Sequence, residues 1–144
     1  MKAAIVQADG KMKVEECPTP DPGPEEILLK VAYCGICGTD LHMADMGIFP
    51  PGCILGHEMS GHVAGVGEGV QGWSEGDAVV VLPMDPCLAC EPCKRGDIQV
   101  CPEGIMRGYG VGVNPGGFGQ YMLVRPSMLY PVPAGLDMKM AALN

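Results

Sequence analysis

Four cysteines lie within fifteen residues of a polar stretch, "CLACEPCKRGDIQVC", residues 87–101. Cys87, Cys90, Cys93 and Cys101 follow the spacing C-x2-C-x2-C-x7-C. A tetrahedral Zn²⁺ binds four thiolates at about 2.3 Å, and C-x2-C turns bring paired sulfurs close enough to share one ion. Four protein ligands leave no open coordination position, so this spacing predicts a structural zinc that holds the loop rather than one that does chemistry.

Two other chemistries are alternatives for this loop. It ends in Cys101-Pro102, as bacterial ferredoxin motifs do, but seven residues precede its last cysteine where those motifs have about three. Disulfides are typical of secreted domains, whereas the N-terminus "MKAAIVQADG" has no signal-peptide pattern. Lys94 and Arg95 lie inside the loop, where they are expected to offset the charge of four thiolates on zinc. We therefore favour zinc over a cluster or disulfides.

A second group of ligand types lies in "CGICGTDLH" (34–42) and "LGHEMSGH" (55–62). Cys37, His57 and Glu58 could give a zinc ion one sulfur, one imidazole and one carboxylate. Catalytic zinc sites have three protein ligands and one position for water or substrate. A lone Cys or His beside a strand is more often a core or surface residue, so spacing alone leaves both interpretations open.

The elements that must position these residues are mostly strands. "KAAIVQA" (2–8) and "MKVEEC" (12–17) flank a turn and predict a hairpin. Alternating apolar residues predict a strand over 25–34. Residues 58–67 and 77–82 are interpreted as strands joined by a Gly-rich turn, and 119–133 as two more short strands. Residues 38–46 suit one or two helical turns, and a helix begins within 136–144. The expected fold class is mainly β with short helices.

Composition limits the class of protein. The 144 residues include 22 glycines and 14 prolines, a quarter of the chain, yet 47% of residues are hydrophobic, as in a compact, turn-rich β domain. The net charge of −8 argues against a nucleic-acid partner. The longest apolar run, 78–84, is too short for a membrane span. Eight cysteines without a secretion signal suggest a reducing compartment, and the expected location is cytoplasmic.

Four segments in this order, "CGICGTDLH", "GHE", the four-cysteine loop and "GGFGQYMLV", resemble the medium-chain zinc-dependent alcohol dehydrogenases. The resemblance covers nearly the whole chain. It implies that residues 1–144 form the GroES-like β-barrel catalytic domain of that family, with the structural zinc lobe at about residues 86–103. The C-G-x-C-G-T/S-D-x-H form is shared with polyol and threonine dehydrogenases.

The resemblance also implies roles for residues of the second group. Cys37 and His57 would bind the catalytic zinc, and Glu58 would lie beside it as an exchangeable ligand. Zinc would lower the pKa of the alcohol so that hydride can pass to NAD or NADP.

Three neighbouring residues would assist. The resemblance implies that Thr39 hydrogen-bonds the substrate hydroxyl and that His42 is the outer end of a proton relay. Asp40 would orient the metal-binding histidine.

Two departures limit this transfer of roles. Gly38 stands where liver-type relatives often carry a basic residue for the cofactor pyrophosphate. The family's remaining zinc ligand is expected beyond Asn144.

No cofactor site is expected in the chain. "GVGEGVQG" (65–72) and "GYGVGVNPGGFG" (108–119) are followed by strand patterns, not by the helix of a Rossmann βαβ unit. The expected function is therefore the zinc-binding catalytic domain of an alcohol or polyol dehydrogenase, inactive alone because the Rossmann domain is absent. Its substrate would be a small alcohol, aldehyde or ketone, and the full-length enzyme a homodimer or homotetramer.

Other functional classes remain as alternatives. A stand-alone zinc-stapled β domain could act as a binding module, or labile zinc thiolates could act as a redox sensor. A chaperone role would rest on fold analogy alone.

Overall fold

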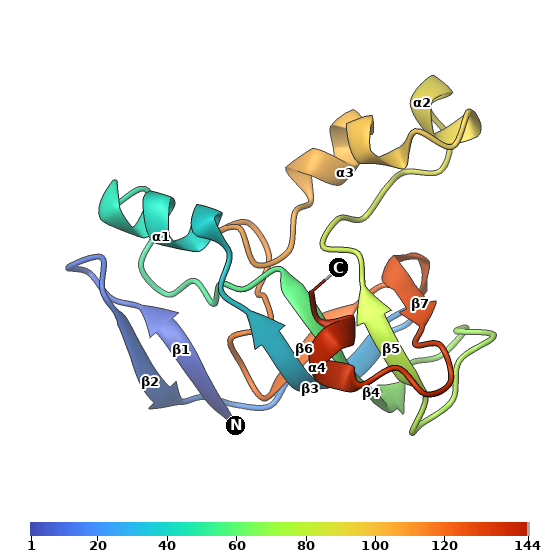
Figure 1. Ribbon diagram of the computed structural model, residues 1–144, viewed down its shortest axis with the longest axis horizontal. Coiled ribbons are helices and arrows are strands. Elements are labelled where there is room, and N and C mark those ends of the chain that lie inside the picture. The colour runs from blue at the N-terminus through green and yellow to red at the C-terminus, as the bar shows by residue number, and fades with distance from the viewer. Residues whose placement is uncertain (144) are drawn as a thin grey trace.

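The computed structural model describes residues 1–143, except the side chains of Met43 and Ile105. Asn144, the last residue of the predicted domain, lies outside the described residues. Strands dominate, which confirms the predicted fold class (Figure 1). The strands are β1 (Lys2–Val6), β2 (Met12–Glu16), β3 (Ile27–Gly35), β4 (Glu58–Val66), β5 (Ala78–Val81), β6 (Tyr121–Val124) and β7 (Leu129–Pro131).

Two antiparallel sheets result. β1 and β2 form the predicted hairpin, and the other five strands pair in the order β6-β3-β4-β5-β7. In the described part of the chain these pairings leave β6 and β7 at opposite edges, so the sheet does not close into a barrel.

The core follows from alternation along the strands. In β3, Ile27 and Leu29 point inward and are fully buried, while Lys30 is exposed. Residues with the same inward placement on the other strands and the following turn complete one apolar cluster, which contains Ile27, Leu29, Met59, Val63, Val79, Val81, Met122, Val124, Met128 and Leu129. Burying several such side chains stabilises the sheet by about 1.5–3 kcal/mol each.

The helices are short and lie at the ends of the strands. They are α1 (Gly38–Asp45), α2 (Glu91–Lys94), α3 (Pro102–Met106) and α4 (Met138–Ala141), with single 3₁₀ turns at Ile98–Val100 and Pro126–Met128. α1 follows β3 directly, whereas α2 and α3 belong to a lobe that projects away from both sheets (Figure 1). Among residues 1–143, no helix is long and apolar enough to cross a membrane.

Neither of the glycine-rich stretches opens a helix. Residues 67–77 form turns between β4 and β5. Residues 108–119 form an irregular segment with one bridge between Tyr109 and Asn114, and lead into β6. The prediction that residues 67–72 of the first stretch form turns leading to a strand is therefore confirmed.

Candidate metal centres

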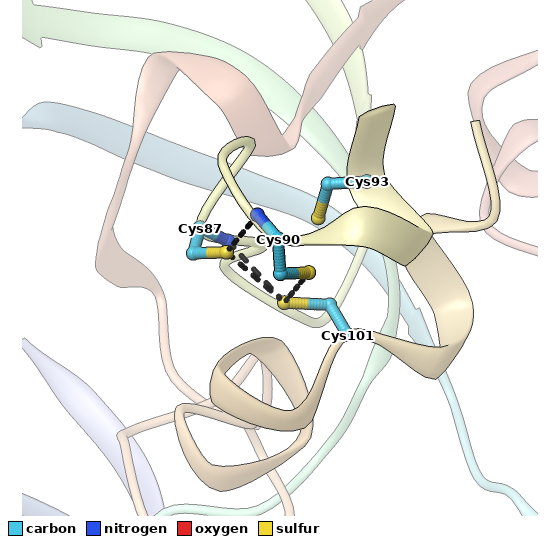
Figure 2. Close-up of side chains that lie close together, drawn as sticks. All are labelled: Cys87, Cys90, Cys93 and Cys101. Atoms are coloured by element: carbon cyan, nitrogen blue, oxygen red, sulfur yellow. Dashed lines mark hydrogen bonds between the residues drawn. The ribbon is translucent and has the colours of Figure 1, made fainter. Parts of the chain in front are cut away.

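The four cysteines of the lobe converge on one point. Figure 2 shows the four side chains close together. Their Sγ atoms all lie within 4.8 Å of one another. The Cys101 sulfur is 3.7 Å from that of Cys87 and 3.9 Å from that of Cys90. Four sulfurs at about 2.3 Å from a tetrahedral zinc lie about 3.8 Å apart, whereas a disulfide requires about 2.05 Å. The cluster therefore fits one shared zinc ion, and all four thiols are free.

Local backbone geometry folds the lobe around these sulfurs. Leu88 adopts a left-handed conformation with φ of 54°, which turns the chain back between Cys87 and Cys90. Backbone N–H groups point at sulfur: Cys90 donates to the Cys87 Sγ at 3.3 Å, and Cys87 donates to the Cys101 Sγ at 3.4 Å (Figure 2). Such donors favour the thiolate form that a metal requires.

Charge is distributed unevenly over the four sulfurs. N–H donors from Cys87 and Gly104 lower the pKa of the buried Cys101 to about 6. Desolvation and neighbouring thiols raise the pKa of Cys93 to about 12. The Cys101 thiolate is thus available at neutral pH, whereas Cys93 must release a proton as a metal binds.

The two cations of the lobe form surface ion pairs. Lys94 Nζ lies 2.9 Å from Glu91, and Arg95 Nε lies 3.3 Å from Asp97. These acidic neighbours weaken the direct compensation of the thiolate charge that the sequence suggested. The backbone N–H groups described above remain as the nearer stabilising groups.

The second group of ligand types also comes together. The ligand atoms of Cys37, His57 and Glu58 lie within 4.8 Å of one another. Cys37 follows the end of β3 and precedes α1, whereas His57 and Glu58 stand at the start of β4. Because β3 and β4 are antiparallel, with Gly35 opposite Glu58, the end of one strand lies beside the start of the other. Strand pairing therefore assembles the group from residues twenty positions apart in sequence.

Asp40 lies directly behind this group. Its side chain is 1% exposed, and its Oδ2 accepts the Cys37 N–H at 2.9 Å. Its Oδ1 lies 3.6 Å from His57 Nδ1, and these two buried atoms have no other partner in the described residues. A small approach of the ring would complete an N–H···O bond and leave Nε2 for a metal, which is how carboxylates orient metal-binding histidines. This orphaned pair indicates that the donor set fits a zinc ion.

Thr39 and His42 lie on α1 at the solvent side of the group. The Thr39 Oγ1 is 3.5 Å from the Cys37 Sγ, and both Thr39 and His42 are exposed. A spacing of three residues places them on one face of the helix. The structure thus brings Thr39 next to the proposed ligands and puts His42 at the surface.

A pocket of about 410 Å³ adjoins the same group. His57 and Glu58 form its polar part, and the apolar part is formed by Val80, Leu82, Pro83 and Tyr130. Such a mostly apolar hollow with a few polar groups is the usual form of a small-molecule site. Sequence reasoning did not identify the apolar lining, because nothing in a strand pattern marks which side chains border a pocket.

Comparison with known proteins identifies the family. Residues 23–134 match the alcohol dehydrogenase GroES-like domain. The chain belongs to this family. The resemblance to zinc-dependent medium-chain alcohol dehydrogenases is thereby confirmed.

Three individual relatives of this GroES-like domain span its whole length. It is 36% identical to a sorbitol dehydrogenase of Bacillus subtilis and 37% identical to an L-threonine 3-dehydrogenase of Stenotrophomonas maltophilia, over 99% of this chain and 41% and 43% of those proteins. A cobalt- and zinc-bound thermostable alcohol dehydrogenase from Pyrobaculum aerophilum superposes with a TM-score of 0.88 at 34% identity, over 99% of this chain and 44% of the other. The chain spans about two fifths of the length of the curated relatives it matches.

Some residues that shape the second centre carry no chemistry and were not predicted from sequence. Gly35 is one: a Cβ there would lie 2.6 Å from the Glu58 Oε2, so glycine leaves room for that carboxylate. Gly56, next to His57, has φ of +95°, and a Cβ there would lie 2.7 Å from the Cys34 sulfur. For Gly56, the only indication in the sequence was its place in the "GHE" segment of the resemblance.

Proposed function

We propose that this GroES-like domain is the zinc-binding catalytic domain of an alcohol or polyol dehydrogenase, which oxidises an alcohol to a carbonyl with hydride transfer to NAD or NADP. The observation that carries the proposal is the convergence of Cys37, His57 and Glu58, with Asp40 buried behind the histidine. The names of its relatives support the reaction class, because they include dehydrogenases of a polyol and of a hydroxyl-bearing amino acid.

The residues of the second centre have distinct roles in this proposal. Cys37 and His57 hold the ion and Glu58 lies beside it, while Asp40 keeps the His57 ring in the tautomer that can bind metal. Zinc, when bound, supplies the Lewis acidity that lowers the pKa of an alcohol. Thr39, 3.5 Å from the Cys37 sulfur, would accept a hydrogen bond from the substrate hydroxyl and, as it takes that proton, pass its own onward, with His42 as the outer end of the relay towards solvent.

The lobe has a structural role. Cys87, Cys90, Cys93 and Cys101 fill all four positions of a zinc ion, so no position remains for substrate. Glu91–Lys94 and Ile98–Val100 bury no side chain, so a structural zinc would stabilise this part of the lobe in place of apolar packing.

The pocket beside His57 limits the substrate class. Its volume of about 410 Å³ suits a small alcohol, aldehyde or ketone whose hydroxyl or carbonyl faces the ligands. The described residues contain no Gly-rich turn that opens a helix, so we place NAD(P) binding on a domain other than residues 1–143. The whole enzyme is proposed to be cytoplasmic, since free thiols persist in a reducing compartment. It is also proposed to be a homodimer or homotetramer, as the resemblance implies.

A second candidate function rests on the lobe alone. Three of its four cysteines are partly exposed, so a stand-alone zinc-stapled β domain could bind a partner or sense oxidants through its thiolates. That function requires one zinc per chain and gives no role to the Cys37 group.

Zinc stoichiometry tests the two functions. Native mass spectrometry of the 144-residue chain is expected to show two zinc ions, falling to one in Cys37→Ser and staying at two in Cys17→Ser, a cysteine outside both groups. One zinc in all three proteins would contradict a second centre built from these residues. NAD(P)⁺-dependent turnover by the purified 144 residues would contradict the placement of the cofactor site.

A further inference from the structure

A glycine-rich segment, residues 108–119, lies against the loop that carries His57. Four backbone hydrogen bonds of 2.8–3.1 Å join the segment to residues 54–56 of that loop. They run from Gly56 N to Gly110 O, from Gly116 N to Ile54 O, from Gly117 N to Gly56 O and from Phe118 N to Leu55 O. The residue before His57 is therefore held on both its N–H and its C=O by this one segment.

Such close approach requires glycine at two positions of the segment. A Cβ on Gly116 would overlap the Gly56 carbonyl and the Cα of Gly110, and would lie 2.7 Å from the Leu55 oxygen. A Cβ on Gly110 would overlap the same Gly56 carbonyl and lie 3.1 Å from the His57 nitrogen. All these atoms are backbone, so no side-chain rotation could relieve the overlap.

Neither side of this contact is free to move away. The segment is closed on itself by a bond from Gly110 N to Asn114 O at 2.9 Å and tied to the base of the lobe by a bond from Tyr109 N to Pro83 O at 3.0 Å. On the other side, the Leu55 side chain is fully buried in a small core cluster with Val6. Added volume must therefore separate the two backbones at Gly56.

We propose that Gly116 and Gly110 are positioning residues for His57. Their missing side chains set how deeply the loop lies in the fold, and hence where the imidazole stands between Asp40 and Cys37. His57 Nδ1 and Asp40 Oδ1 lie 3.6 Å apart, just beyond hydrogen-bond distance, so a small approach completes the bond and a displacement of about one ångström puts it out of reach. The inference rests on the proposed function, in which His57 binds zinc.

Gly116→Ala is the informative variant, because the φ of Gly116 lies outside the left-handed region and only space demands glycine there. Two other glycine-to-alanine variants serve as controls. Gly119→Ala adds a methyl group in the same segment, where its nearest neighbour is 3.4 Å away. Gly67→Ala places a methyl group onto the backbone of Gly23, beyond the other end of β4. It destabilises the fold without touching the loop of His57.

Two readouts are taken on protein whose lobe is filled with one equivalent of zinc. Cobalt titration, followed by absorption, measures the metal affinity of the second centre. We expect about a 10- to 100-fold loss in Gly116→Ala, as when a group that orients a ligand is changed. Two-bond ¹H–¹⁵N imidazole spectra without added cobalt report the His57 tautomer. We expect Nδ1–H in wild type and a mixture in Gly116→Ala.

The controls decide what each result means. Unchanged affinity and tautomer in Gly119→Ala and in the folded fraction of Gly67→Ala support positioning rather than general stability. The same His57 tautomer in wild type and Gly116→Ala would overturn the inference. Failure of every variant and of wild type to bind cobalt would instead overturn the proposed metal centre, while the tautomer still decides the positioning role.

Discussion

Asp40→Asn is the sharpest test of the second metal centre, because it changes chemistry without changing shape. Asp40 now accepts the Cys37 N–H with one oxygen at 2.9 Å and faces His57 Nδ1 with the other at 3.6 Å. Asparagine has one oxygen and one NH₂ group. If the oxygen keeps the Cys37 N–H, the NH₂ group faces His57 and favours the tautomer with the proton on Nε2. That tautomer has no lone pair on Nε2 for a metal.

The magnitude follows from this conflict. To bind a metal through Nε2, the variant must carry its proton on Nδ1, where it faces the N–H donor of the amide. The alternative is to rotate the amide, but its NH₂ group then faces the Cys37 N–H, which is also a donor. Loss of a carboxylate that orients a ligating histidine costs about 10- to 100-fold in metal affinity, or about 1.4–2.7 kcal/mol. Asp40 is 1% exposed, so solvent cannot replace the lost acceptor.

The assay is cobalt or zinc affinity at the second centre, with the lobe already loaded. Asp45→Asn is the matched control, because Asp45 is exposed at the end of the same helix. We expect the control to bind as wild type does, and Asp40→Asn to bind about 10- to 100-fold more weakly with the lobe still occupied. Equal affinity in Asp40→Asn and wild type would refute the role given to Asp40.

The lobe gives two further predictions. Cys101→Ser removes the buried thiolate that receives two N–H donors. The lobe should then retain no zinc at equimolar metal, and the thermal midpoint of unfolding should fall. An unchanged zinc content by mass spectrometry would count against the four-cysteine centre. Because the pKa of Cys101 is lowered to about 6, its stabilisation of the zinc-free lobe is present above the ordinary thiol pKa of 9.0 and is lost as pH falls towards about 6. Zinc binding to the lobe at about pH 7.5 should then release fewer than four protons in a weakly buffered titration, and four would contradict a preformed thiolate at Cys101.

Local sequence signals predicted the parts of the fold that depend on neighbours along the chain. Alternation of apolar residues placed β3, and the turn at Gly10 placed the β1–β2 hairpin, because side-chain period and turn chemistry are local properties. The C-x2-C spacing likewise predicted the lobe, since its ligands lie close in sequence. Closure of the sheet depends on which distant strands pair at its edges, and the sequence carried no local signal for it.

The second centre marks the limit of such reasoning. Cys37 and His57 are separated by a helix and an irregular loop, so spacing alone could not decide whether they meet. Their meeting depends on the antiparallel register that sets Gly35 opposite Glu58. The resemblance supplied this pairing for the ligands; it included Gly116 within "GGFGQYMLV" but gave that glycine no role.

The dependence on glycine has a physical consequence for how the two centres tolerate change. In the lobe, the sulfurs are brought together by turns within one short segment, and N–H groups of the same segment receive them. In the second centre, the ligands come from two segments, the β3–α1 turn and the start of β4, and their relative placement depends on backbone contacts at Gly116 and Gly110 that a single methyl group would break. Substitutions far from the ligands should therefore disturb the second centre far more often than the lobe. Its fine geometry is determined by the absence of side chains as much as by the chemistry of those present.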